Sequence, residues 1–299
     1  MKKLFVKLVK FSIPFIIYLI IVSIVDPFSY IYANSLVKHE TKAQISQRIE
    51  PHLYKMIAFE NNPKTNIVIG DSRSNRFYET ISVHSDKWSP LGYGGASLNE
   101  ILSTFDWLVE NDYKIDTLLV GLNFNLYNKF NKRMWVEETI ERKSNFFSYA
   151  FSSYTAKSTF LILKDLVSSK SDTIGKPKIS RAKFWEASVK NYGKKFYDNY
   201  SYPETGYQRL SKISEYCNQK EIELIFWIPP CAKDINDITD EYGLSSENER
   251  FINDIRGLGN LYDFNSDVTI TSQRSNFTDP SHFNKEIGEK IYQEIFKKK

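Results

Sequence analysis

The run from Asn66 to Arg73 constrains the fold more than any other part of the chain. It reads Asn-Ile-Val-Ile-Gly-Asp-Ser-Arg, and three consecutive β-branched residues are typical of a strand covered on both faces, as in a parallel sheet. A polar segment over 74–80 follows and is expected to be helical. Gly-Asp-Ser is also ordinary turn chemistry. However, open α/β sheets bind ligands beyond the carboxyl ends of their strands, where Ser72 stands. The free N–H groups at the start of a following helix would face the serine oxygen.

Strand and helix patterns alternate along most of the remaining chain. Buried strands are predicted over 116–121, 222–228 and 260–264, and helices over 98–109, 208–219, 247–255 and 283–296. The run over 89–95 is rich in Gly, Ser and Pro and is interpreted as a turn. Repeated β-then-α units predict an α/β fold whose parallel, doubly wound sheet has helices on both faces.

The alternation breaks between about residues 125 and 206. This stretch is rich in Tyr, Phe, Lys and Ser and has weak periodicity. It is interpreted as a largely helical insertion. Long insertions are often functional, so a lid or an acceptor-binding surface is one expectation, and extra packing on one edge of the sheet is the other.

The N-terminal end is predicted to be a membrane anchor. Residues 1–27 hold a basic start followed by the apolar run Phe11–Val25, which would be ~22 Å long as a helix, against ~30 Å of hydrocarbon. Extension back through Leu8, with Lys10 snorkelling, makes a span feasible. The preceding lysines favour a cytoplasmic N-terminus and a single-pass cell-membrane protein with an extracytoplasmic domain. A cleaved signal peptide is less favoured, because Ile31 occupies a position where a small residue is expected before Ala33.

Two further segments complete the predicted organisation. Residues 28–63 would form a stem, helical around 42–59, and residues 64–299 the main domain.

The net charge of +4 gives no indication of a nucleic-acid partner, because seven lysines at the two ends supply more than that excess. Cys217 and Cys231 form no Cys-x-x-Cys pair; they are interpreted as two small buried residues, with a single disulfide as the alternative. No cofactor and no metal site is predicted, because no His, Asp and Glu cluster has ligand spacing.

One histidine lies among residues that are typical of a catalytic base. His282 lies in Asn-Phe-Thr-Asp-Pro-Ser-His, three residues after Asp279. A carboxylate at that spacing can reach the imidazole Nδ1–H across a Pro-Ser turn, which leaves Nε2 free to accept a proton from a serine hydroxyl. The alternative for an isolated Asp-x-x-His is a turn aspartate and a surface histidine.

Acyl transfer through a serine also needs donors aimed at the developing oxyanion. Gly94 and Gly95 allow a backbone N–H to approach closely, because no Cβ is in the way. Asn123 follows the predicted strand over 116–121 and offers a side-chain N–H at the same sheet edge. The alternatives are a tight turn for the glycines and a strand-end cap for the asparagine.

In chain order, the blocks Gly-Asp-Ser72, Gly95, Gly-x-Asn123 and Asp279-x-x-His282 resemble the SGNH/GDSL hydrolase superfamily. The similarity covers residues 64–299. It implies a flavodoxin-like three-layer α/β/α domain with Ser72 as nucleophile and His282 as base, oriented by Asp279. The Ser72 N–H, the Gly95 N–H and the Asn123 side chain would form the oxyanion hole, with Gly94 and Asn125 as fallbacks.

The chain departs from the family pattern at two positions. Arg73 follows the serine where leucine is usual. It is expected to pair with a surface carboxylate, and the alternative is that it holds an acidic group near the site. Phe124 replaces a polar residue that is common in the third block, which makes the oxyanion role of Asn123 less secure than the Ser72–His282 pair.

An anchored, outward-facing domain of this kind is similar to bacterial proteins that move acyl groups onto cell-surface polymers. The resemblance implies an O-acetyltransferase or esterase acting on a polysaccharide, working beside a multi-spanning membrane acyltransferase. A catalytically silent protein of the same fold that binds glycan or such a partner is the alternative.

Overall fold

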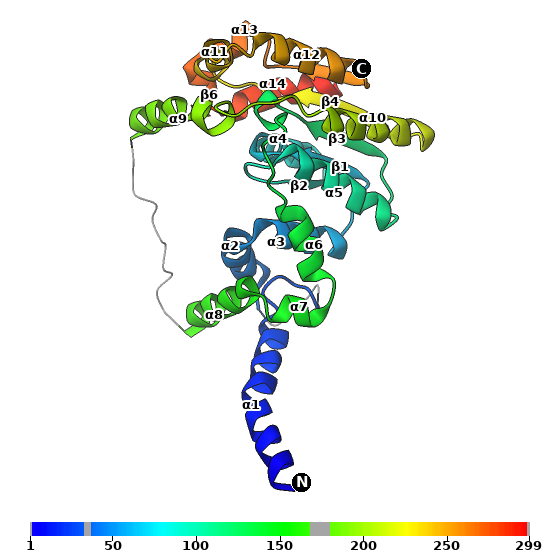
Figure 1. Ribbon diagram of the computed structural model, residues 1–299, viewed down its shortest axis with the longest axis vertical. Helices are drawn as coiled ribbons and strands as arrows, with labels where there is room; N and C mark the ends of the chain where they lie inside the picture. The colour runs from blue at the N-terminus through cyan, green and yellow to red at the C-terminus, as the bar shows by residue number, and fades with distance from the viewer. Residues whose placement is uncertain (1, 33–36, 168–179, 298–299) are drawn as a thin grey trace. The chain divides into compact units, whose positions relative to one another are not determined.

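The computed structural model describes residues 2–32, 37–167 and 180–297 (Figure 1). These residues form two compact units. The first holds the described residues of 1–62 and 135–176, and the second holds those of 63–134 and 177–299. Most of the predicted stem therefore shares a unit with the middle of the predicted insertion, and the two ends of the insertion belong with the sheet.

The first unit is built from helices. They are α1 (Lys2–Val25), α2 (His39–Ile49), α3 (Pro51–Asn61), α6 (Trp135–Lys143), α7 (Phe146–Ala150) and α8 (Ser153–Val167). The stem is helical as predicted, and it consists of two helices, α2 and α3. The break lies at Glu50, because Pro51 lacks an N–H and its ring clashes with the preceding turn. The Glu50 side chain accepts a hydrogen bond from the His52 N–H and so caps α3.

Helix α1 is long and apolar enough to cross a membrane over Lys3–Val25. Its 24 residues contain Pro14. Most of its apolar side chains are exposed, whereas Val22 and Val25 near its end are buried against the rest of the unit. The length and composition agree with the predicted span.

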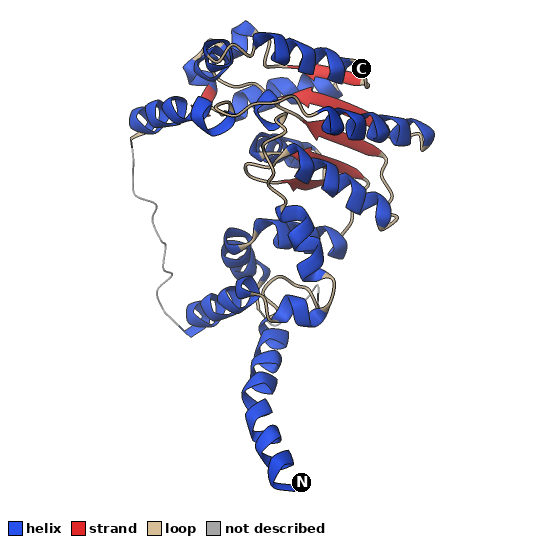
Figure 2. Ribbon diagram, viewed as in Figure 1, coloured by secondary structure: helices blue, strands red, loops and turns tan. Residues whose placement is uncertain are grey.

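The second unit contains a five-stranded parallel sheet, which confirms the predicted α/β class (Figure 2). The strands are β1 (Asn66–Gly70), β2 (Trp88–Gly92), β3 (Thr117–Gly121), β4 (Glu223–Ile228) and β5 (Asn260–Asp263). Their order is β2-β1-β3-β4-β5. The order reverses between β1 and β3, and such a switch point is where doubly wound sheets place their ligands.

Helices and short segments complete this unit. They are α4 (Ser72–His84), α5 (Leu98–Glu110), η1 (Phe124–Leu126), α9 (Arg181–Phe196), α10 (Glu204–Gln219), α11 (Lys233–Glu241), α12 (Ser245–Arg256), α13 (Val268–Thr271), η2 (Arg274–Asn276), β6 (Phe277–Asp279), β7 (His282–Phe283) and α14 (Lys285–Phe296). Helices α4 and α14 pack on the sheet face that carries Val68, Leu119 and Ile225. Helix α5 contacts β1 and helix α10 contacts β4, and both lie on the other side of the sheet from α4 (Figure 1).

The segment predicted to be a turn over 89–95 is partly a strand. β2 runs from Trp88 to Gly92 and pairs with β1 along its whole length. Its Pro90 is compatible with a strand because β2 is at the sheet edge, where a missing N–H breaks no ladder on the outer side. The turn begins only after the strand, at Gly94 and Gly95.

Candidate active site

The candidate nucleophile stands at the switch point of the sheet. Ser72 is the first residue of α4, and the Asp71 side chain caps this helix by accepting a hydrogen bond from the Arg73 N–H. Strand β1 pairs with β2 on one side and β3 on the other. The carboxyl ends of these three strands therefore bring Ser72, the glycine turn after β2 and Asn123 to one edge of the sheet.

The structure brings Ser72 and His282 together across 210 residues of sequence. The Ser72 Oγ lies 2.7 Å from His282 Nε2, and His282 Nδ1 lies 2.8 and 2.9 Å from the two oxygens of Asp279. The side chains of His282 and Asp279 are 31% and 24% exposed, so the group is reachable from solvent. An alcohol, an imidazole and a carboxylate in this order form the hydrogen-bonded chain that activates a serine.

The carboxylate favours its ionised form. Partial burial opposes the charge on Asp279, but the hydrogen bond with His282 and hydrogen bonds from backbone N–H groups outweigh it, and the pKa of Asp279 is lowered. One of these bonds is from the Ser281 N–H to Oδ1, at 3.0 Å. A charged carboxylate on Nδ1 holds the imidazole in the tautomer that presents Nε2 to the serine.

Asp279 and His282 sit on the β6–β7 hairpin, which other parts of the second unit hold in place. Arg181 in α9 donates from Nη2 to the carbonyl oxygens of Arg274 and Phe277, each at 2.8 Å. Arg76 in α4 donates to the Phe283 carbonyl at 3.2 Å. Sequence reasoning did not find these two arginines, because bonds to distant main-chain oxygens leave no mark in the local pattern.

Arg73 is buried, so the prediction that it pairs with a surface carboxylate was wrong. It is 3% exposed and forms an ion pair at 2.6 Å with Asp71, which is buried as well. It also donates to Asn125 Oδ1 at 2.8 Å and lies 2.9 Å from Cys231 Sγ. Burial disfavours the guanidinium charge, but Asp71 more than compensates, and the pKa of Arg73 is raised. One side chain thus joins the segments that follow β1, β3 and β4.

The structure places the candidate oxyanion donors as follows. Asn123 is 4% exposed, and its Nδ2 has no hydrogen-bond partner among the described residues. Asn125 is oriented by Arg73. Gly94 and Gly95 are exposed in the turn after β2; Gly95 has φ +66°, which favours glycine, and the Gly94 carbonyl accepts a hydrogen bond from Arg133 at 2.9 Å.

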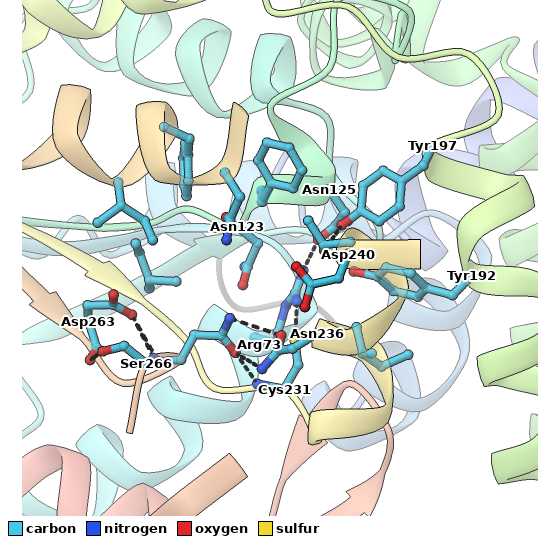
Figure 3. Close-up of a pocket in the computed structure, with 18 residues that line it drawn as sticks. Arg73, Asn123, Asn125, Tyr192, Tyr197, Cys231, Asn236, Asp240, Asp263 and Ser266 are labelled. Carbon is cyan, nitrogen blue, oxygen red and sulfur yellow. Dashed lines mark hydrogen bonds between the residues drawn. The ribbon is translucent and has the colours of Figure 1, made fainter. Parts of the chain in front are cut away.

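A cavity of about 210 Å³ lies beside Arg73 and beyond the carboxyl ends of β3, β4 and β5 (Figure 3). Asn123 and Asn125 line one part of it, and Tyr192 and Tyr197 line another. Burial raises the pKa of Tyr192 and raises that of Tyr197 to about 12, so both phenols stay neutral. Tyr192 comes from α9, so the predicted insertion contributes to this cavity.

The two cysteines are free and buried. Cys217 lies in α10 and Cys231 follows β4, next to Arg73. The disulfide alternative is therefore absent from the structure. Within residues 2–32, 37–167 and 180–297, no group of three or more His, Cys, Asp and Glu side chains could hold a metal ion.

Comparison with known proteins adds no family assignment. No family model matches the chain, and neither does any curated protein sequence.

Proposed function

We propose that this protein is a serine-dependent esterase or O-acyltransferase that works through an acyl-enzyme on Ser72. The observation that carries the proposal is the hydrogen-bonded chain from Ser72 Oγ through His282 to Asp279, at 2.7 and 2.8 Å. Its location beyond the end of β1, at the start of a helix, supports the same role, because helix N-termini stabilise developing negative charge.

The reaction would proceed in two halves. Ser72 Oγ attacks the carbonyl carbon of an ester while its proton moves to His282 Nε2. The tetrahedral intermediate then collapses, the bond to the leaving alcohol breaks, and His282 returns the proton to the leaving oxygen. In the second half, water or a sugar hydroxyl gives its proton to His282 and attacks the carbonyl carbon of the acyl-enzyme. The bond between this carbon and Ser72 Oγ then breaks, the acid or the new ester leaves, and His282 returns the proton to Ser72 Oγ. Hydrolase and transferase share the first half and differ only in the second nucleophile.

The oxyanion would be held by the Ser72 N–H, the Gly95 N–H and the Asn123 side chain. The unpartnered Nδ2 of Asn123 supports this assignment, because a buried N–H without a partner is costly unless a ligand completes it. Asn125 is less suited, since its side chain is already engaged by Arg73.

The substrate class rests on the resemblance to SGNH/GDSL hydrolases and on the apolar α1. The sheet order β2-β1-β3-β4-β5 is that of flavodoxin-like domains and is compatible with the resemblance. We place the domain outside the cell membrane, with O-acetyl groups on a cell-surface or exported polysaccharide as the substrate and a multi-spanning acyltransferase as the partner.

A fluorophosphonate probe tests the nucleophile directly. The full chain should be labelled on Ser72, and it should hydrolyse a chromogenic acetyl ester. Ser72→Ala should abolish labelling and lower turnover by about 10³-fold or more. Ser82→Ala, on an exposed position of the same helix, is the matched control and should behave like the parent chain.

Two results would contradict the proposal. Turnover that is unchanged in Ser72→Ala would exclude Ser72 as the nucleophile. A folded chain that neither reacts with the probe nor cleaves esters at several pH values would favour the silent glycan-binding or partner-binding alternative.

A further inference from the structure

The last turns of α1 are attached to α7 and α8. The Tyr18 hydroxyl donates a hydrogen bond of 2.5 Å to the Ala150 carbonyl, and the Tyr18 ring stacks on Phe151 with centroids 5.6 Å apart. Val25 shares a buried cluster with Ile162 of α8. In Figure 1, α7 and α8 lie on either side of the C-terminal end of α1. Their level along α1 is therefore determined by packing within the first unit.

Both short helices expose apolar side chains at this level. Those of α7 and the residue after it are Phe147, at 62%, and Phe151, at 50%. On α8, Phe160 is 66% exposed, and Leu163 and Leu166 are 37% and 59% exposed. Isolated exposed apolar residues are common, but five on two adjoining short helices form a surface that needs a partner.

The length of α1 indicates where the surface of a bilayer would lie along it. A hydrocarbon core of ~30 Å takes about 20 helical residues. If the span starts at Leu4, the first apolar residue after the N-terminal lysines, it ends near Ser23, and a later start moves its far boundary further along the chain. Ile20 and Ile24, on the side of α1 that the unit leaves uncovered, are 53% and 51% exposed and agree with this boundary. The boundary thus falls among the turns that hold α7 and α8.

We propose that α7 and α8 form a second membrane contact, which rests on the bilayer surface where α1 emerges. Phe147, Phe151, Phe160, Leu163 and Leu166 would enter the boundary between headgroups and acyl chains. Lys157 and Lys164 of α8 are exposed beside them, and lysines at this depth bind anionic headgroups. The first unit would then contact the lipid surface as well as connect α1 to the sheet-bearing unit. This inference depends on α1 spanning the membrane and does not depend on Ser72 chemistry.

Photocrosslinking of the full chain tests this contact. Benzoylphenylalanine is introduced singly at Phe147 and Phe160, where it resembles the native ring, and the chain is reconstituted in vesicles of phosphatidylcholine and phosphatidylglycerol. Ile17→benzoylphenylalanine, on the exposed side of α1, is the positive control. Trp135→benzoylphenylalanine is the matched negative control, because this residue is 50% exposed at the opposite end of α6 from α7.

The expected result is a mass increase of one phospholipid at residues 147, 160 and 17, and none at 135. Adducts at residue 17 with none at 147 and 160 would overturn the proposal, and so would an absence of lipid adducts at residue 17. The same variants irradiated in native membranes give a further check: exclusive crosslinks from residues 147 and 160 to another protein would also overturn it, because the surface would then be a protein-docking site. The Ser72 labelling experiment is unaffected by any of these outcomes.

Discussion

At the scale of single residues, Arg73 connects the segments that form the candidate site. Its guanidinium is enclosed by Asp71, Asn125 and Cys231, which follow three different strands. A buried ion pair adds little net stability compared with apolar packing, but removal of one partner leaves an uncompensated charge. We therefore infer that the pair selects which segments meet at the site rather than adding to net stability.

We predict that Arg73→Met will lower the free energy of unfolding by about 3–5 kcal/mol, because it leaves the Asp71 carboxylate buried without a positive partner. The control is Lys233→Met, whose ion pair with Asp237 in α11 is largely exposed and contributes less than about 1 kcal/mol. Urea unfolding of both variants gives the comparison. Equal losses would show that the buried pair has no special role.

The lowered pKa of Asp279 predicts a pH-dependent contribution to stability. The folded state binds the proton of this carboxyl less tightly than the unfolded chain, so the pairing stabilises the protein at neutral pH. This contribution is lost as the pH falls through the folded-state pKa. The stability difference between the parent chain and Asp279→Asn should therefore be present at pH 7 and shrink in acid. Urea unfolding at several pH values measures it, and a difference that grows in acid would contradict the assignment.

At the scale of elements, the junction between β1 and α4 sets the position of Ser72. Gly70 has φ +145°, and a Cβ there would lie 2.1 Å from Ser74 Oγ and 2.9 Å from the Gly121 carbonyl oxygen. Only glycine allows the chain to leave the strand so close to its neighbours and to begin the helix two residues later, at the serine.

Gly70→Ala should therefore destabilise the protein by more than about 1 kcal/mol and slow fluorophosphonate labelling. Gly259→Ala is the matched control, since a Cβ at Gly259 meets no atom closer than 3.6 Å. Thermal unfolding and labelling rates of the two variants are compared. A Gly70→Ala chain with parental stability and labelling would show that the junction tolerates a side chain.

At the scale of the whole molecule, the N-terminal end of α1 and the sheet-bearing unit are expected on opposite sides of the membrane that α1 crosses. Native cysteines do not interfere with thiol probes of this topology, because both are buried and burial raises their pKa, to about 12 for Cys217. Lys3→Cys and Val83→Cys place single accessible thiols at the two ends of interest, and Val83 is 66% exposed.

In intact cells, a membrane-impermeant maleimide should label Val83→Cys and should label Lys3→Cys only after the membrane is opened. The positive residues before the apolar segment are the physical reason for this orientation. Gel-shift analysis of the two variants provides the measurement. The reverse labelling pattern would place the sheet on the cytoplasmic side, and release of the chain by alkaline carbonate would show that α1 does not span.

Local patterns predicted strands β1, β3, β4 and β5 and helices α4, α5, α10, α12 and α14, but they did not predict α11. Ile67–Ile69 and the apolar run of β3 are continuous and β-branched or aliphatic, so their type was predictable. β2 was not, because Pro90 and the neighbouring glycines indicate a turn unless the strand is known to lie at an edge. The helical stem was also predictable, and the break between α2 and α3 follows from Pro51, which cannot continue the preceding helix.

The sequence by itself determined the class of fold, the apolar helix at the N-terminus and the residue types for serine chemistry, because these depend on local periodicity and short motifs. The tertiary structure decided which of these residues meet. The 2.7 Å contact of Ser72 with His282, the burial of Arg73 and the division of residues 125–206 between two units all depend on long-range packing. Such contacts join segments that are distant in sequence, and no local pattern specifies them.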